Sequence, residues 1–154
     1  SYTANIYPDL SNPFDLALFN TYRTATYPDS WPRELALNTD QRGTLFEAVK
    51  GGGGGQTFLS TTQPGITRGD HFHLAKVERF LVVQGEATIR IRKVLDDEIW
   101  EYKVSGDAPA PVDMPVLHTH SIENTGDTEL LTLFWTHDLF DQSNPDTYAD
   151  KVLK

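Results

Sequence analysis

The sequence has no cysteine, no long apolar run and few histidines, and each shortage narrows its chemistry. Without cysteine, the 154-residue chain forms no disulfide, thiolate zinc site or cysteine nucleophile. Any metal must therefore be held by carboxylates and by the five histidines. No run approaches the roughly 18 apolar residues of a membrane span, and the N-terminal segment lacks the charged start and apolar core of a secretory signal. We therefore expect a cytoplasmic protein.

Basic residues are also fewer than acidic residues. Lys and Arg total 13 against 22 Asp and Glu, which gives a formal net charge of -9 at pH 7. This charge repels nucleic acid and anionic membranes, so neither is an expected partner. A phosphate-bearing ligand would need local arginines to overcome the repulsion, which makes the positions of the arginines informative.

The length suits one domain, and the pattern of the chain changes near residue 35. Residues 10–23 predict a short helix, because a proline suits the first turn and apolar residues recur at helical spacing. Residues 24–34 contain two prolines and predict a turn-rich connector. We expect residues 1–34 to be an N-terminal helix and linker, and residues 35–154 to be the main domain.

Beyond Leu35, the chain consists of short segments of mostly alternating apolar and polar residues, bounded by Gly, Pro, Asp or Asn. These segments span residues 42–49, 56–63, 79–84, 87–94, 98–104, 110–115, 118–124 and 129–136. About eight strands joined by tight turns predict a double-sheet roll or barrel. The glycine-rich stretch 50–56 leads into a strand pattern rather than a helix, so it predicts a hairpin loop and not a phosphate-binding loop. We expect residues 140–154 to form a turn and a short helix.

Two histidines stand one residue apart at the start of a strand-like run, in GDHFHLAKVERFLVVQG (69–85). On an extended strand His71 and His73 share one face, because side chains alternate with period two. Glu78 follows in the same run, and a second segment, PVLHTHSIEN, supplies His120. Three imidazoles and one carboxylate suit Zn, Fe, Mn, Ni or Co.

An isolated His-x-His pair is more often a surface or packing feature, but the spacing here is more demanding. Gly69-x-His71-x-His73-x4-Glu78-x6-Gly85, followed by Pro115-x4-His120-x3-Asn124, resembles both halves of the cupin signature. This implies an all-β fold, the cupin double-stranded β-helix or jelly-roll barrel, with a short N-terminal helix. It also implies a metal site made of His71, His73, Glu78 and His120. One departure is Leu117, which stands where the cupin pattern usually has glycine.

Longer stretches resemble the C-terminal cupin domain of bifunctional capsular polysaccharide assembling enzymes, namely STTQPGITRGDHFH (60–73), ERFLVVQGEATIRIR (78–92), HSIENTGDTELLTLFW (120–135) and FDQSNPDTY (140–148). The resemblance covers residues 35 to 150 or so. It implies a metal-dependent C3 epimerase that acts on a UDP-2-acetamido-2,6-dideoxy-4-hexulose in capsular polysaccharide or O-antigen precursor synthesis. The divalent metal that we expect is zinc.

The same resemblance implies partners for the chain. It implies a homodimer and an upstream short-chain reductase domain that uses NADPH. No G-x-G-x-x-G or Tyr-x3-Lys motif occurs in these 154 residues, so the reductase is not part of this chain.

Two short stretches, RGTLFE (42–47) and GITRGDHFH (65–73), also resemble dTDP-4-dehydrorhamnose 3,5-epimerase, a cupin-fold enzyme that uses no metal. That resemblance implies His71 as the catalytic base, and Arg68 and Arg42 as substrate-binding residues.

The two resemblances give His71 different tasks. An imidazole nitrogen that binds a metal cannot also take a proton, so a metal-bound His71 requires another base. The candidates are Lys76, His118 and Tyr102. Without a metal, His71 is available as the base.

Other polar residues near these motifs receive supporting roles. Glu47 and Asn124 are expected to contact substrate or to orient the histidines. Arg90 and Arg92 share one face of a predicted strand, and we expect that face to be solvent-exposed.

Two other functions fit the same residues. One is a non-catalytic cupin that binds a sugar nucleotide or dimerises. The other is a metal cupin dioxygenase, because three histidines and a glutamate also serve oxygen chemistry.

Overall fold

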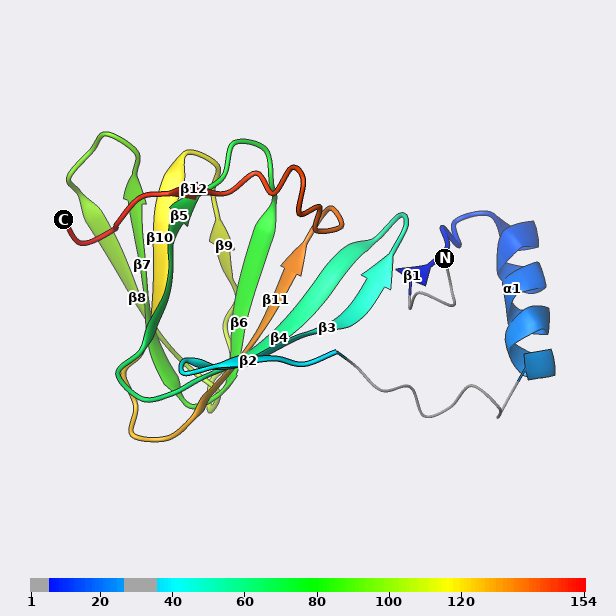
Figure 1. The fold of residues 1–154 in the computed structure, drawn as a ribbon, viewed down its shortest axis with the longest axis horizontal. Helices are drawn as coiled ribbons and strands as arrows, with labels where there is room; N and C mark the ends of the chain where they lie inside the picture. The colour runs from blue at the N-terminus through cyan, green and yellow to red at the C-terminus, as the bar shows by residue number, and fades with distance from the viewer. Residues whose placement is uncertain (1–5, 27–35) are drawn as a thin grey trace.

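Two sheets form the body of the protein in the computed structural model, which describes residues 6–26 and 36–154 (Figure 1). One sheet has the strand order β1-β3-β4-β11-β6-β9, with β2 beside β3, and the other has the order β12-β5-β10-β7-β8. The expectation of an all-β cupin roll with a short N-terminal helix is therefore confirmed.

The first sheet contains β1 (Ile6–Tyr7), β2 (Asn38–Asp40), β3 (Gly43–Gly51), β4 (Gly55–Thr62), β6 (Glu78–Gln84), β9 (Val112–Met114) and β11 (Leu130–Thr136). The second contains β5 (Thr67–Phe72), β7 (Glu86–Lys93), β8 (Ile99–Ser105), β10 (His118–Asn124) and β12 (Tyr148–Ala149). Each strand-like segment expected from the sequence coincides with one of these strands. The strands β1, β2, β5 and β12 were not among those segments.

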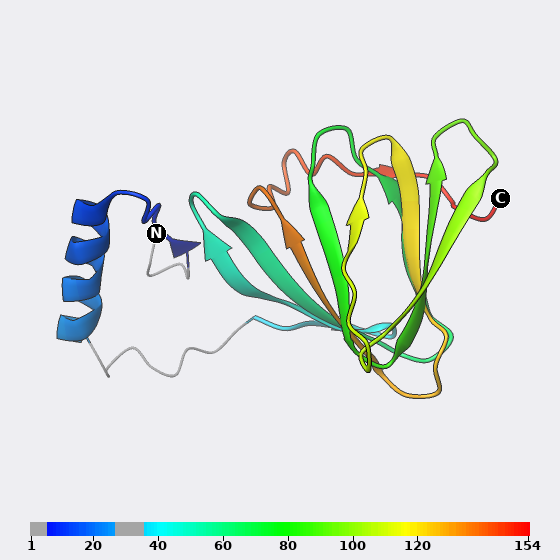
Figure 2. The same cartoon turned by 180° about the vertical axis from the view of Figure 1, so that it is seen from behind.

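The single helix of the described residues, α1 (Pro13–Thr26), lies at the far end of the first sheet, away from the C-terminus (Figures 1 and 2). Phe14 N donates to Asn12 Oδ1, which caps the helix at its N-terminal end. The helix was predicted at residues 10–23, and most of the predicted connector lies outside the described residues. No helix in the described ranges has the length and apolarity that crossing a membrane requires.

The core lies between the two sheets. Alternation within β7 sends Ile89 and Ile91 inward, where they pack with Val82, Met114 and Ile122. The residues in between face outward from the second sheet, as the sequence pattern predicts.

The outer face of β7 is not wholly exposed to solvent, and the expectation for Arg92 was wrong. Its side chain is 1% exposed because the C-terminal segment lies over it. Arg92 Nη2 donates to Asp150 Oδ2 at 2.8 Å and to the carbonyl of Lys151 at 2.7 Å. Arg90 forms ion pairs with Glu101 and Glu123.

The C-terminal residues 140–154 contain the expected turn, but the two-residue strand β12 stands where we expected a short helix. In β12, Tyr148 pairs with Phe72 and Ala149 pairs with His71, so the segment extends the second sheet beside β5. Val152 beyond it is 1% exposed. The segment thus holds the strand that carries His71 and leads into His73.

Candidate metal and substrate site

The structure brings together the four side chains that the sequence singles out as metal ligands. His71, His73, Glu78 and His120 each offer one ligand atom, and these atoms all lie within 4.8 Å of one another. Glu78 Oε2 lies 3.1 Å from His73 Nε2 and 3.3 Å from His120 Nε2. The ring centres of His71 and His120 are 4.8 Å apart.

These residues come from both sheets. His71 is in β5, His73 follows that strand directly, and His120 is in the neighbouring strand β10. His120 and His71 are directly paired across the two strands. Glu78 begins β6 in the opposite sheet, so the cluster joins the two layers of the roll.

A β-bulge sets which side chains of β5 face the interior. His120 pairs with His71, Ser121 pairs with Gly69, and the register shifts between them, which leaves Asp70 as an extra residue. Asp70 has a positive φ of 58°. Because an extra residue reverses the alternation, Arg68 before the bulge and His71 after it both face the interior.

The hydrogen bonds of two imidazoles fix which nitrogen faces the cluster. His73 Nδ1 lies 2.6 Å from the carbonyl oxygen of Asp146, and His120 Nδ1 lies 3.4 Å from that of His118. A carbonyl only accepts hydrogen bonds, so each Nδ1 carries a proton and each ring turns its Nε2 inward.

This arrangement places two imidazole Nε2 atoms beside one carboxylate oxygen. Such groups attract only when a proton on Nε2 or a cation lies between them. His120 Nε2 has no hydrogen-bond partner of good geometry within the described residues. Three histidines and one carboxylate are a ligand set that zinc and similar divalent metals accept, so the residues fit such an ion.

The electrostatics set the protonation of two of these groups, Glu78 and His71. Burial would raise the pKa of the Glu78 carboxyl, but its contacts with the His120 and His73 imidazoles lower the pKa to about 2. Burial lowers the pKa of His71 to about 4, and the neighbouring rings of His120 and His73 lower it as well. At neutral pH Glu78 is a carboxylate and His71 is a neutral imidazole.

A cavity of about 220 Å³ opens beside the cluster. Its walls are formed by Arg42, Leu45, Ser60, Arg68, Gly69, His71, Glu78, Phe80, His120, Ile122, Thr132 and Phe134. The proposed metal ligands, apolar side chains and hydroxyl groups therefore share one space with the two predicted substrate-binding arginines.

The two arginines make part of this cavity positively charged in an otherwise acidic protein. Arg68 donates from Nε to Thr62 Oγ1 at 3.0 Å and from Nη2 to the carbonyl of Thr61 at 2.8 Å. Arg42 forms an ion pair with Asp40 at 2.5 Å. Burial lowers the pKa of Arg68, and the Arg42 charge lowers it further. A bound anion would relieve this repulsion between the two guanidinium groups.

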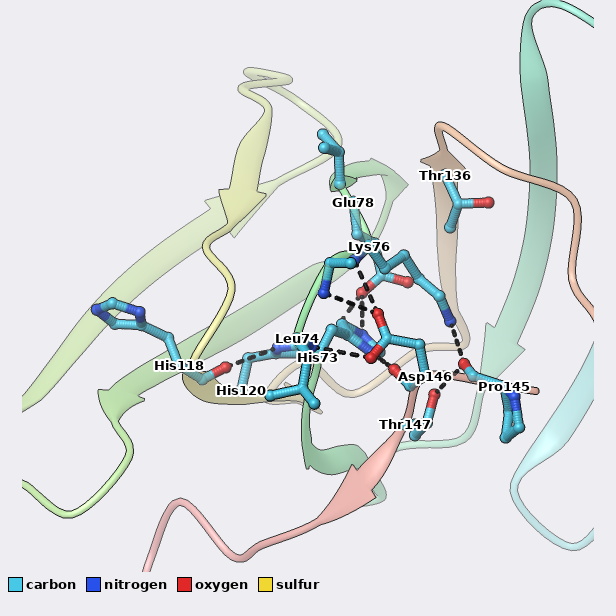
Figure 3. A network of polar contacts seen from close by, with 12 residues as sticks. His73, Leu74, Lys76, Glu78, His118, His120, Thr136, Pro145, Asp146 and Thr147 are labelled. Atoms are coloured by element: carbon cyan, nitrogen blue, oxygen red, sulfur yellow. Dashed lines mark hydrogen bonds and ion pairs between the residues drawn. The ribbon is translucent and has the colours of Figure 1, made fainter.

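Two of the predicted catalytic groups do not line the cavity. Lys76 donates its ammonium group to the carbonyl of Pro145 at 2.9 Å, although its charge is near enough to lower the pKa of His71. His118 turns away from the cluster (Figure 3), and its Nδ1 lies 2.9 Å from the carbonyl of Val116.

The predicted supporting residues lie outside the cavity wall too. The side chain of Asn124 donates to the carbonyls of Thr62 and Thr128 and accepts from Gly126 N, so it holds the turn after β10. Glu47 forms an ion pair with Lys50 at 2.6 Å.

Sequence reasoning missed three residues that the structure brings to the site. Ser60 and Thr132 pair across β4 and β11 and line the cavity, and Thr132 Oγ1 has no partner within the described residues. Asp146 contacts His73 from the C-terminal segment. The alternation of residues 56–63 and 129–136 could have placed the two hydroxyls on the inner face, but no pattern marks Asp146.

Comparisons with known proteins agree with this geometry. Residues 38–148, more than half of the chain, match the model of the polysaccharide biosynthesis C-terminal domain. The crystal structure of the capsular polysaccharide assembling protein CapF from Staphylococcus aureus matches with a TM-score of 0.90 at 43% identity, over 97% of this chain and 41% of that chain.

Curated relatives carry names from sugar-nucleotide and glycan synthesis. A Pseudomonas aeruginosa protein named UDP-2-acetamido-2,6-beta-L-arabino-hexul-4-ose reductase is 36% identical over 136 residues, which are 88% of this chain and 37% of that protein. A Haloferax volcanii protein named as the probable low-salt glycan biosynthesis epimerase Agl13 is 25% identical over 74% of this chain and 81% of its own length.

The chain spans less than half the length of the Pseudomonas relative and of CapF. Oxalate decarboxylase from B. subtilis shares the fold alone, at 16% identity and a TM-score of 0.61. The resemblance seen in the sequence is confirmed, and the chain belongs to the family of the polysaccharide biosynthesis C-terminal domain.

Proposed function

We propose that this chain is a C3 epimerase of a UDP-2-acetamido-2,6-dideoxy-4-hexulose and that it depends on a divalent metal, with zinc as the expected ion. The relatives support the substrate class, since their names refer to a UDP-hexulose, to capsular polysaccharide assembly and to an epimerase. His71, His73, Glu78 and His120 are the proposed metal ligands.

One observation carries the proposal, namely that three of the four proposed ligands and two arginines line one cavity. His71, Glu78 and His120 line the cavity together with Arg42 and Arg68. A keto sugar linked to a diphosphate needs positive charge both near its ketone and near its phosphates. The chain places two arginines there in spite of its net charge of -9.

Epimerisation at C3 begins with removal of a proton next to the C4 ketone, which leaves negative charge on the ketone oxygen. A bound divalent metal would supply Lewis-acid stabilisation of that charge. Arg42 and Arg68 bind the diphosphate and orient the sugar. The apolar side chains of Leu45, Phe80 and Phe134 limit the access of water to the reacting carbon.

The base follows from the number of metal ligands. If all four side chains hold the metal, the base is Lys76, whose side chain must then leave the Pro145 carbonyl, turn into the cavity and act as the neutral amine. If three hold it, the neutral imidazole of His71 is the base. The metal content of His71→Ala separates these cases, because loss of metal identifies His71 as a ligand.

The assembly proposed from the family has three parts. We include in the proposal a homodimer, a cytoplasmic location and a separate NADPH-dependent reductase domain that acts on the epimerised product. The greater length of the Pseudomonas relative and its name as a reductase support the last part.

Isotope exchange tests the function directly. The chain is incubated with the 4-keto UDP-sugar in deuterated water without oxygen, and the sugar is analysed for deuterium at C3. We expect label at C3. Tight binding without label would instead support a non-catalytic sugar-nucleotide cupin, and turnover only after admission of oxygen would support a dioxygenase.

A further inference from the structure

Asp146, a residue of the C-terminal segment, contacts the site at several points. Its carbonyl oxygen lies 2.6 Å from His73 Nδ1. Its carboxylate accepts hydrogen bonds from the backbone N–H groups of Leu74, Ala75 and Lys76, each at 2.9 Å. Figure 3 shows this one residue reaching both the imidazole and the loop that follows it.

The contact with the carbonyl controls the direction in which His73 Nε2 points. Because the carbonyl accepts a hydrogen bond from Nδ1, the ring turns its Nε2 toward Glu78. Partners of this kind orient metal-binding imidazoles and make them more basic ligands.

The contact with the carboxylate holds the loop between two proposed ligands. Residues 74–77 connect His73 to Glu78, and packing holds them weakly, since Leu74 is 51% exposed and Val77 is 53% exposed. Three N–H groups that converge on one carboxylate therefore provide much of the order of this loop. The separation of the two ligands depends on that order.

The rest of the C-terminal segment keeps Asp146 in place. Lys76 Nζ donates to the Pro145 carbonyl just before it, and β12 pairs with β5 just after it. Asp146 has a positive φ of 44°, a conformation that Asp, Asn and Gly adopt more readily than other residues.

We infer that Asp146 is a positioning residue of the metal site, which sets the orientation of His73 and the distance between His73 and Glu78. The inference rests on the proposed function, because it concerns the same metal site. No proton or electron moves to or from Asp146 in this role.

The test measures metal binding in place of turnover. Asp146→Gly removes the carboxylate but keeps the backbone conformation, and Asp146→Asn keeps the size and retains an oxygen that accepts part of the hydrogen bonds. Asp141→Gly is the matched control, because Asp141 accepts hydrogen bonds from Ser143 in the same segment without contact to the loop at 74–76. Zn²⁺ affinity is measured by chelator competition, Co²⁺ coordination by visible absorption, and folding by near-ultraviolet circular dichroism.

We expect Asp146→Gly to bind Zn²⁺ about 10- to 100-fold more weakly than the wild type and to change the Co²⁺ spectrum. Asp146→Asn should lose less affinity, and Asp141→Gly should match the wild type. A folded Asp146→Gly with wild-type affinity would overturn the inference, as would an equal loss in Asp141→Gly. If Asp146→Gly does not fold, Asp146→Asn decides, since wild-type affinity there overturns the inference. A wild-type chain that binds neither ion would overturn the proposed function as well.

Discussion

At the scale of single residues, the protonation of the imidazoles decides what the site can do. Carbonyl groups hold the Nδ1 protons of His73 and His120, so both rings offer Nε2 toward the Glu78 carboxylate. His71 also lines the cavity, as His120 does, but no carbonyl contact within the described residues orients its ring in the same way. His71 can therefore bind a metal or contact a substrate. Its protonation has consequences that can be measured.

The buried His71 makes the metal-free chain sensitive to acid. Its pKa falls from 6.5 to about 4, mainly because of burial. A group with a lowered pKa favours folding fully above its unfolded value, so this contribution is lost as the pH falls from about 6.5 to about 4. We expect the free energy of unfolding of the EDTA-treated chain to drop over this range by on the order of 2 kcal/mol. Urea denaturation of the wild type and of His71→Gln measures it, and an equal drop in the variant would contradict the assignment.

Leu117 has an unusual backbone conformation. Its φ is 58°, in the left-handed region, where side chains other than those of Gly, Asn and Asp are disfavoured by about 1–2 kcal/mol. We expect Leu117→Gly to raise the melting temperature by about 2–4 °C, since the relief of strain exceeds the entropic cost of the glycine. Leu117→Ala, which keeps the strained conformation, should show no such rise. An equal or greater rise in Leu117→Ala would mean that the exposed leucine side chain, and not the backbone, is at fault.

The site residues differ in how far the sequence could predict them. The motif spacing predicted His71, His73, Glu78 and His120, because residues at this spacing come close together when the chain folds. It could not show that Lys76 reaches toward Pro145 in place of the cavity. Asp146 was missed because its backbone carbonyl makes the contact with His73, and a carbonyl has no signature in a sequence.

At the scale of elements, the bulge in β5 is the feature that assembles the site. The extra residue lets Arg68 and His71 face the interior together, although their spacing would place them on opposite faces of a regular strand. The bulge depends on Gly69, which has a φ of 97°, and on Asp70 beside it. The strand β12 pairs with β5 directly after the bulge, at the edge of the second sheet.

Gly69 therefore cannot be replaced without cost. A Cβ at this position would lie 2.8 Å from the carbonyl oxygen of His120, so Gly69→Ala should cost several kcal/mol of stability and weaken Zn²⁺ binding. Gly65→Ala is the matched control, because Gly65 has a φ of 76° but no atom within 4 Å of the added carbon. It should cost about 1 kcal/mol from backbone strain alone. Equal losses in both variants, measured by urea denaturation, would show that the close approach to β10 is unimportant.

Strands were predicted where alternation was regular and were missed where it was not. The segment that became β7 alternates over most of its length, and it was found close to its observed bounds. The strand β5 carries a bulge, and β12 contains only Tyr148 and Ala149, so neither gives a periodic signal. The helix expected in residues 140–154 was wrong, because pairing with β5 decides the conformation of this segment.

At the scale of the whole molecule, charge separates the cavity from the rest of the surface. The chain has a net charge of -9, yet Arg42 and Arg68 share one cavity wall. A UDP-sugar is repelled by the overall field and attracted by this local pair. Binding of the nucleotide should therefore depend on ionic strength.

We expect Arg68→Gln to weaken binding of UDP by about 10-fold, because a charged hydrogen-bond donor is lost. The variant should also show a smaller loss of affinity than the wild type when KCl is raised. Arg79→Gln is the control, since Arg79 forms an exposed ion pair with Asp113 outside the cavity. Calorimetric titration with UDP at two salt concentrations measures both effects. A wild-type affinity for Arg68→Gln would remove this residue from the diphosphate site.

The overall fold was the most predictable feature, because strand alternation and the two-part histidine motif both indicated a cupin roll. The side of the second sheet that the C-terminal segment covers was not predictable. Arg92 is buried by residues nearly 60 positions further along the chain, and its hydrogen bond with Asp150 spans 58 residues. Contacts of that range depend on where the chain returns, which local pattern does not record.

The central claim is that four side chains from both sheets hold one divalent ion. Calorimetric titration of Zn²⁺ into the EDTA-treated chain tests it most directly, with His120→Ala and the outward-facing His118→Ala as a matched pair. We predict one high-affinity site per chain in the wild type and in His118→Ala, and none in His120→Ala. A wild-type chain that takes up no zinc, or an unchanged stoichiometry in His120→Ala, would contradict the account.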